Sequence, residues 1–186
     1  MLLILKINDI SIKNIIFCEP INNTVIDNSK FIRFIYSDTY LSMNGIYLKS
    51  NLNMGGLEAN FNKFKCYFNI EENRSVINKL NEIEANILSK YNTVKSPSYK
   101  LKDSLSKGQL KIYNENYDRY NKSKNLYNKN TEDEKKHEDN QKHEDNQKHE
   151  DNKKTDKSDP NIILKISGLW VDEFEYGLTF KFLTIN

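Results

Sequence analysis

Basic and aromatic side chains share one side of five strand-like segments in this sequence. When the more apolar side of each segment is placed inward, every segment leaves at least one lysine or arginine on its polar side, and three of them add an aromatic ring. No acidic residue falls on that side of these five segments. Lysine and arginine bind phosphates and aromatic faces stack on any base, so the pattern indicates single-stranded nucleic-acid binding with little sequence preference. The candidate binding residues are Phe31, Arg33, Tyr47, Lys49, Lys63, Lys65, Tyr67, Lys165 and Lys181.

Lysines on a sheet also have a second interpretation. Many β proteins carry lysines on exposed faces and edges, where the charges prevent pairing with strands of other molecules. The polar side is then a solvated surface or binds an acidic partner. In that case the protein is a structural or protein-interaction module without nucleic-acid binding. Strong salt dependence and a preference for single strands would favour the first interpretation.

Residues suited to catalysis are missing from the segments that predict a folded core. The sequence contains no P-loop, no GxSxG motif and no glycine-rich dinucleotide turn. Its three histidines, His137, His143 and His149, all lie in a low-complexity repeat. Cys18 and Cys66 stand alone, so no CxxC metal site exists. We therefore expect no enzymatic activity, no metal and no cofactor.

Two periodicities predict the secondary structure. β-branched and aromatic residues predict strands within residues 2–20, 30–37, 42–50, 63–70 and 110–113 and in the last segment of the chain, with a flexible loop at 53–60. From Arg74 to Tyr91 the apolar residues recur with the spacing of one helix face. Ser98 is the candidate N-cap of a second, short helix that Gly108 ends.

The last strands follow a long polar segment. Residues 114–159 contain Leu126 as their only residue among Ile, Leu, Val and Met, and they include the tandem repeat KHEDNQ. Such a segment cannot bury enough apolar surface to offset its ordering entropy, so we expect it to be disordered. Residues 1–113 and 160–186 then form a single discontinuous domain, in which the C-terminal strands pair with the N-terminal ones.

The stretch around the start of this segment is strongly basic. Residues 90–129 contain ten lysines or arginines against three acidic residues, together with six tyrosines. A basic arm with interleaved tyrosines suits single-stranded nucleic acid. The same composition also suits a linker that is merely soluble. The formal net charge of the whole chain is only +2, so this excess of positive charge is local.

Neither a membrane span nor a secretory signal is predicted. The chain has no long apolar run, and its first residues hold only a short apolar stretch that no basic region precedes. We therefore expect an intracellular protein that is not secreted and does not bind a membrane. Both cysteines are then expected to be reduced, buried thiols.

The motif ISGLWVDEFEYGLTFKF at 166–182 carries a family resemblance. It consists of a small residue, Gly168, an aliphatic residue, Trp170, a short turn, Tyr176-Gly177 and an alternating strand. This pattern resembles the terminal hairpin of the single-stranded-DNA-binding proteins of nucleocytoplasmic large DNA viruses, which are related in fold to those of T7-like phages. The segment FIRFIYSDTYLSMNGIYLKS resembles that of uncharacterised giant-virus proteins that share this ending.

The resemblance implies a mainly β (α+β) fold of OB type, a five-stranded, partly open barrel with one long helix and a long disordered insertion before the last hairpin. It implies binding of single-stranded DNA, with RNA as the alternative polymer, in viral replication, recombination or repair. The location is then the site of viral replication in the cytoplasm or nucleus of the host cell, with viral replication proteins as partners. Gly168 predicts a β-bulge that turns Trp170 into the core.

Overall fold

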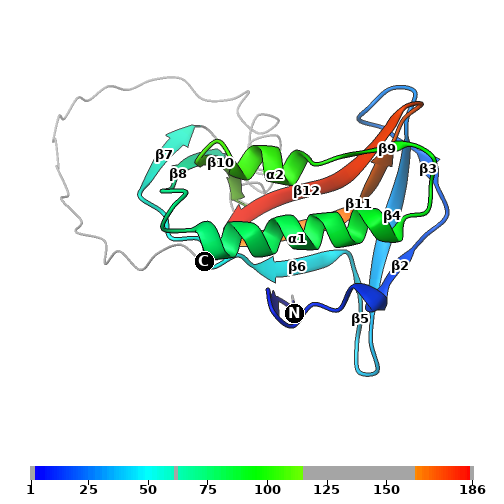
Figure 1. Cartoon of the computed structure of the whole chain (residues 1–186), viewed down its shortest axis with the longest axis horizontal. Helices are drawn as coiled ribbons and strands as arrows, with labels where there is room; N and C mark the ends of the chain where they lie inside the picture. Colours follow the sequence, from blue (N-terminus) through cyan, green and yellow to red (C-terminus); the bar gives the residue numbers. More distant parts are fainter. Residues whose placement is uncertain (1–2, 61–62, 115–161, 185–186) are drawn as a thin grey trace, which may run out of the picture.

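The computed structural model describes residues 3–60, 63–114 and 162–184. These residues form a mainly β fold in which twelve strands belong to one mixed sheet (Figure 1). Two α-helices, α1 and α2, accompany the strands. The predicted mainly β class is confirmed, but the sheet contains more strands than the five of the expected barrel. The predicted disordered insertion lies outside the described residues, apart from Asn114.

The elements follow one another in chain order as a series of short strands, a pair of helices and a closing hairpin. The strands are β1 (Leu5–Lys6), β2 (Ile15–Phe17), β3 (Ile21–Asn22), β4 (Lys30–Ser37), β5 (Ser42–Asn44), β6 (Ile46–Lys49), β7 (Gly56–Asn60), β8 (Lys63–Tyr67), β9 (Ser96–Ser98), β10 (Gln109–Asn114), β11 (Ile162–Val171) and β12 (Glu175–Thr184). The α-helices are α1 (Arg74–Lys90) and α2 (Lys100–Leu105), and a 3-10 turn spans Ile12–Asn14.

The closing hairpin of β11 and β12 lies at the centre of the sheet, whose main path is β1-β6-β11-β12-β10-β8-β7. β11 pairs with β12 along one edge, and with β6 and then β4 along the other. β12 pairs in parallel with β10 and β9 on its far edge. The prediction that the last strands pair with strands from the N-terminal part of the chain is confirmed by these registers.

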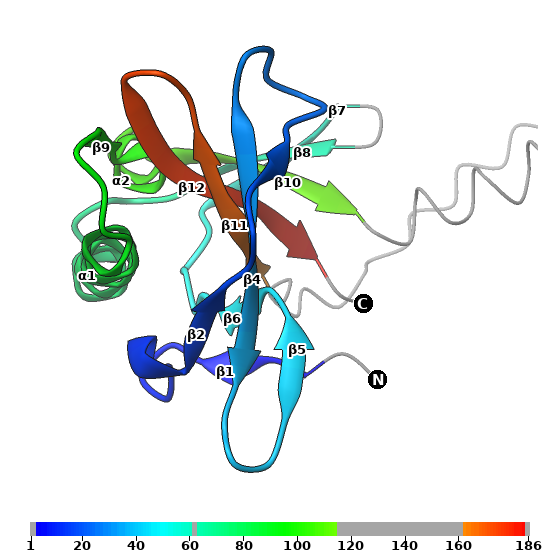
Figure 2. The same ribbon diagram turned by 90° about the vertical axis from the view of Figure 1, so that its right-hand side faces the viewer.

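The inner face of the sheet packs on α1 and α2, and Figure 2 shows α1 end-on to one side of β11 and β12. α1 buries a stripe at helical spacing, which confirms the predicted helix to within one residue at its end. The buried apolar residues of the helices are Ile77, Leu80, Ile83, Ile87, Leu88, Leu101 and Leu105. The buried apolar strand residues that alternation predicted are Ile32, Phe34, Tyr36, Ile46, Leu48, Cys66, Phe68, Ile162, Leu164, Ile166, Leu178 and Phe182. Two further residues predicted inside, Phe64 and Phe180, are half-buried and pack against this core.

Two glycines allow β11 to pair with two strands, one after the other, on the same edge. Gly45 has φ +82° and ends β5 just before β6, where a Cβ would lie 2.8 Å from the Ile166 carbonyl oxygen. At Gly168 a Cβ would lie 2.1 Å from the carbonyl oxygen of Ile32. The register of β11 against β12 shifts between Ile166 and Gly168, so the predicted bulge is present. The glycines therefore let β4 and β6 approach β11 one after the other.

The predicted core position of Trp170 is wrong. The bulge reverses the alternation after Ile166, so Leu169 points inward and is 0% exposed. Trp170 is half-buried, lies opposite Phe31 and Gly177 in the neighbouring strands, and belongs to the outer face. A Cβ on Gly177 would lie 2.9 Å from the indole, so this glycine makes room for the tryptophan ring.

Three local predictions also need correction. The predicted loop at 53–60 contains the edge strand β7. Residues 42–50 form two strands, because β5 pairs with β4 whereas β6 pairs with β11. Ser98 lies in β9, and α2 begins after Tyr99 with no side-chain cap from the N-cap residue. Gly108, predicted as the stop, has the positive φ of +62° that such a position favours.

A buried carboxylate from α1 takes the place of the missing cap. Glu84 is 0% exposed, and its two carboxylate oxygens accept hydrogen bonds of 2.9 Å each from the backbone N–H groups of Leu101 and Lys102. These N–H groups belong to the first turn of α2, which has no intrahelical partner for them. Burial raises the pKa of Glu84, and the two hydrogen bonds oppose that shift.

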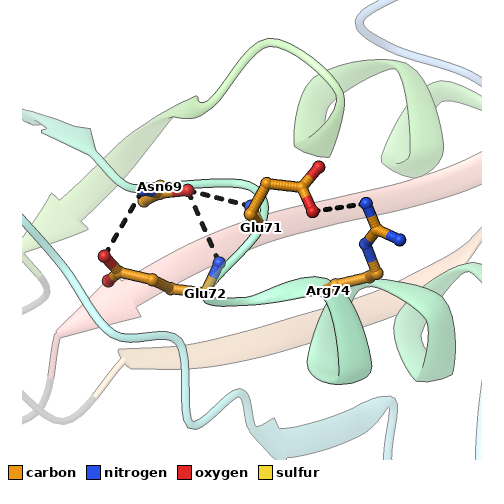
Figure 3. A network of polar contacts seen from close by, with 4 residues as sticks. All are labelled: Asn69, Glu71, Glu72 and Arg74. Atoms are coloured by element: carbon orange, nitrogen blue, oxygen red, sulfur yellow. Dashed lines mark hydrogen bonds and ion pairs between the residues drawn. The ribbon is translucent and has the colours of Figure 1, made fainter.

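The loop before α1 is ordered by asparagines. Figure 3 shows Asn69, whose side-chain oxygen accepts hydrogen bonds from the backbone N–H groups of Glu71 (2.9 Å) and Glu72 (3.4 Å), and the ion pair of Glu71 with Arg74. Asn73 is 2% exposed and exchanges hydrogen bonds with the backbone of Asn53, its Nδ2 donating at 2.9 Å and its Oδ1 accepting at 2.7 Å. The start of the helix is thereby joined to the loop before β7.

Both cysteines are free thiols. Cys66 is 0% exposed, and burial raises the pKa of its thiol to about 11. Cys18 is only half-buried, so the predicted burial holds for Cys66 alone.

Replacement of Gly168 by alanine is expected to destabilise the protein by about 3 kcal/mol, the upper part of the usual range for overpacking, because the new methyl group meets backbone rather than a movable side chain. Urea unfolding measures the loss. Gly56→Ala is the matched control, since a Cβ there has nothing within 4 Å, and it should change stability by less than about 0.5 kcal/mol. Equal effects of the two substitutions would contradict the close approach of β4 and β11.

Replacement of Glu84 by glutamine sets an amide NH2 group, which cannot accept a hydrogen bond, against one of the two backbone N–H donors. A protonated carboxyl still offers an oxygen there, so the substitution is expected to cost about 1–3 kcal/mol at acid pH. Because the folded pKa of Glu84 lies above its ordinary value of 4.5, its contribution is complete below that value and is lost as the pH rises through the folded pKa. The difference in unfolding free energy between the parent and Glu84→Gln should therefore shrink as the pH rises. The exposed Glu82→Gln on the same helix controls for the lost charge. A difference independent of pH would contradict the assignment.

Candidate nucleic-acid interface

Strand registers bring lysines from four adjacent strands into one line across the outer face. Lys165 on β11 lies opposite Lys181 on β12, and Lys111 on β10 lies opposite Lys65 on β8. Ile112 on β10 pairs with Phe182 on β12. Lys111 and Lys181, which precede these two residues in parallel strands, are therefore neighbours as well. We call Lys165, Lys181, Lys111 and Lys65 the lysine row. At the usual strand spacing the row covers about 14 Å.

Tyrosines accompany these lysines. Tyr47 on β6 lies opposite Lys165 and extends the row by one strand, and the Lys165 Nζ lies 4.9 Å from the centre of its ring. The Nζ of Lys65 lies 4.9 Å from the ring of Tyr67 on the same strand. Each pair sets an ammonium group beside an aromatic face, which is the arrangement of a cation–π contact. The phenol of Tyr67 raises the pKa of Lys65, first through a side-chain hydrogen bond and then through its charge.

An acidic residue ends the row on the edge strand. Glu58 on β7 lies opposite Lys65, and the Tyr67 hydroxyl donates a hydrogen bond of 3.0 Å to its carboxylate. The prediction of a polar face without acids concerned five other strands. Glu58 lies on β7, which the sequence predicted to be a loop. Glu58 therefore lies beside two residues that were predicted to bind a strand, Lys65 and Tyr67, and it engages the hydroxyl group of Tyr67.

The next line across the same face is different in character. Lys49, Ile163, Leu183, Tyr113 and Lys63 lie side by side on β6, β11, β12, β10 and β8. The Nζ of Lys63 lies 5.2 Å from the Tyr113 ring, a third lysine–tyrosine pair. Ile163 and Leu183 are 1% and 0% exposed, so the middle of this line is buried although it belongs to the outer face. The accessible polar surface is therefore the lysine row with the two ends of this second line.

Two predicted residues lie apart from the others. Arg33 lies opposite Gly168 and Phe31 opposite Trp170, towards the other end of β11. The distance along the strand from Lys165 to Trp170 is about 16 Å. Arg33 is exposed, and Phe31 is half-buried. The structure therefore brings seven of the nine predicted residues together and leaves Phe31 and Arg33 in a separate region beside Trp170.

Lys111 and Tyr113 are the principal residues that the sequence prediction missed. The segment LKIY was predicted to be a strand, and its own alternation places these two side chains on one side with Leu110 and Ile112 on the other. Leu110 and Ile112 are buried at 4% and 0% exposure. The signal was therefore present in the sequence, but the pairing of β10 between β8 and β12 could be read only from the fold.

Part of the predicted basic arm has a structural role instead. The Nζ of Lys90 donates hydrogen bonds to the carbonyl oxygens of Ile12 (2.9 Å), Lys13 (3.1 Å) and Ile15 (2.6 Å), and so joins the end of α1 to the N-terminal segment. Lys95 donates to the carbonyl oxygen of Asp172. Residues 115–129 of the arm lie outside the described residues.

The described residues contain neither a candidate metal site nor a candidate membrane-spanning helix. Within 3–60, 63–114 and 162–184, no group of three His, Cys, Asp or Glu side chains is placed to hold a metal ion. The three histidines of the repeat lie outside these ranges. Over the same part of the chain, neither helix has the length and apolar character needed to cross a membrane.

Comparison with known proteins gives no relative from which a role could be transferred. No protein-family model, curated protein or solved structure matches the chain. A role for this protein therefore has to be inferred from its own sequence and structure.

Proposed function

We propose that the outer face binds single-stranded nucleic acid without catalysis. The observation that supports this proposal is the repeated pairing of a lysine with a tyrosine on one face, at Tyr47–Lys165, Tyr67–Lys65 and Tyr113–Lys63. An ammonium group suits a phosphate, and the adjacent ring offers a stacking surface to any base. A nucleotide presents these two chemical groups close together, so each lysine–tyrosine pair matches one nucleotide unit.

The strand would cross the sheet along the lysine row. From Tyr47 to Lys65 the row covers about 19 Å at the usual strand spacing, which corresponds to the lower end of the site sizes of about 4–16 nucleotides that single OB folds bind. Lysines contact phosphates as point charges and make no bidentate pattern with base edges, so sequence preference should be slight. Among the predicted residues, Arg33 and Phe31 then contact only a longer strand that also reaches the end of β11.

We further infer that the sheet is of OB type and that the polymer is DNA in a viral replication setting. The support for the fold is a curved antiparallel core of β4, β6, β11 and β12 with α1 packed on its inner face. The support for DNA, for viral replication proteins as partners and for an intracellular replication site is the resemblance of the closing hairpin at 166–182. The parallel strands β9 and β10 are additions to that plan.

Substitution of Tyr47 by alanine should weaken binding of an oligothymidylate by about 1–3 kcal/mol, because a stacking platform is lost. Lys165→Ala should reduce affinity for all sequences alike and should lower the slope of log K against log salt by about 0.7, since one phosphate contact disappears. For the parent protein, four row lysines predict a slope near −3. Fluorescence anisotropy at several salt concentrations measures both quantities.

Lys79→Ala is the matched control for these substitutions, because Lys79 lies on α1 and pairs with Glu82 at 2.9 Å. Thermal unfolding of all variants checks that the fold is retained. If Tyr47→Ala, Lys165→Ala and Lys79→Ala bind equally well, or if the parent prefers duplex to single strands, strand binding at this face is refuted. The interaction-module alternative would then be the better account of the lysines.

Replacement of Glu58 by glutamine should strengthen binding, by about threefold to tenfold if one phosphate contact is gained at low salt. The carboxylate lies opposite Lys65 and accepts the hydrogen bond of Tyr67, so the substitution removes a negative charge from beside both residues and lets a phosphate approach Lys65 more favourably. The effect should decrease as salt is raised, because exposed charges are then screened. Unchanged affinity would show that the strand does not reach β8.

A further inference from the structure

A cavity opens where two strands share one edge of β12. β9 pairs with β12 at Glu175–Gly177, and β10 pairs with it from Phe182 onward. Between these two pairings the chain leaves the edge of β12 to form α2, and Phe180, Lys181 and Phe182 of β12 line an opening there. The cavity at this place measures about 420 Å³. That volume is within the usual range of about 300–1,000 Å³ for small-molecule sites.

The walls of the cavity are unusually basic. Lys65, Lys111 and Lys181 reach it from the lysine row, and Lys107 reaches it from the turn after α2. No acidic side chain is among the lining residues that the structure describes. Lysines gathered around one opening attract an anion more strongly than a single exposed lysine does. The electrostatics therefore favour a ligand with at least one phosphate.

Aromatic rings form another part of the wall. Tyr113 and Phe180 line the cavity together with the four lysines, and Phe180 is half-buried at the border of the core. A cavity that combines lysines with exposed ring surface offers a site to a phosphate and to a flat apolar group at the same time. A phosphate alone would leave the ring surface unused.

We propose that this cavity binds one nucleotide, with its phosphate among the lysines and its base against the aromatic wall, and that this nucleotide belongs to the strand on the lysine row. The proposal deepens the proposed function and rests on it for the choice of a nucleotide over other phosphate esters. It adds Lys107, which lies outside the predicted binding residues, and it gives the strand one anchored position instead of uniform contacts along the row.

Titration calorimetry with thymidine monophosphate, inorganic phosphate and an oligothymidylate of about ten nucleotides tests the proposal. Lys107→Ala should weaken binding of both the mononucleotide and the oligonucleotide by about tenfold, because a hydrogen bond to a charged group is lost. Lys100→Ala is the matched control, since Lys100 is also exposed, belongs to α2 and does not line the cavity. It should change either affinity by less than about twofold.

The outcomes separate this proposal from strand binding itself. If Tyr47→Ala weakens oligonucleotide binding while Lys107→Ala does not, the strand uses the row and the cavity proposal is overturned. If the mononucleotide binds in a Lys107-dependent way but the oligonucleotide does not bind, the proposed function fails and the cavity takes only free nucleotides, which overturns the strand part. If inorganic phosphate binds as tightly as the mononucleotide, the aromatic wall contributes nothing and the nucleotide assignment is overturned.

Discussion

The pairing of β11 with β12, β6 and β4 is the constraint on which the other features of this protein depend. β11 has three partner strands, with β12 on one edge and β6 and then β4 on the other. Its register decides which side chains of three neighbouring strands reach the outer face. A one-residue slip would exchange Lys165 with Ile166 or Leu164 and would place a lysine in the core. The arrangement of side chains on the outer face therefore follows from the packing of the inner face.

The bulge before Gly168 divides this strand into two parts with different outer surfaces. Before the bulge the outward residue is Lys165, beside Tyr47 and Lys181; after it the outward residue is Trp170, beside Phe31. The inner face stays apolar on both sides of the bulge, because Ile166 and Leu169 are both 0% exposed. A single inserted residue thus keeps the core continuous while it separates a basic region from an aromatic one.

The faces of the strands could be predicted because alternation is a local property. Residues such as Ile46 and Leu48 are separated by one outward residue, and a two-residue period needs no knowledge of the partner strand. The bulge could be suspected from Gly168, but its consequence for Trp170 depends on where the extra residue falls between two registers. The cap of α2 could not be predicted, because Glu84 lies 17 residues before Leu101, whose backbone N–H group donates a hydrogen bond to it. Glu58 was missed because a short edge strand that begins at a pair of glycines, Gly55 and Gly56, has a weak local signal.

The arrangement of charges on the outer face could not be predicted from single segments either. Two pairs of lysines lie directly opposite one another in antiparallel strands, Lys165 with Lys181 and Lys111 with Lys65. Each such pair destabilises a sheet by roughly 0.2–1 kcal/mol. The fold tolerates two such pairs side by side, and it holds Lys165 and Lys65 against tyrosine rings that partly offset the repulsion. No single segment of sequence contains this arrangement, because each strand contributes only one or two of its charges. Sheet formation itself concentrates them, and a phosphate chain laid across the row would replace lysine–lysine repulsion by attraction. If the face binds a strand as proposed, that ligand would stabilise the fold through the same lysines that repel one another across the sheet.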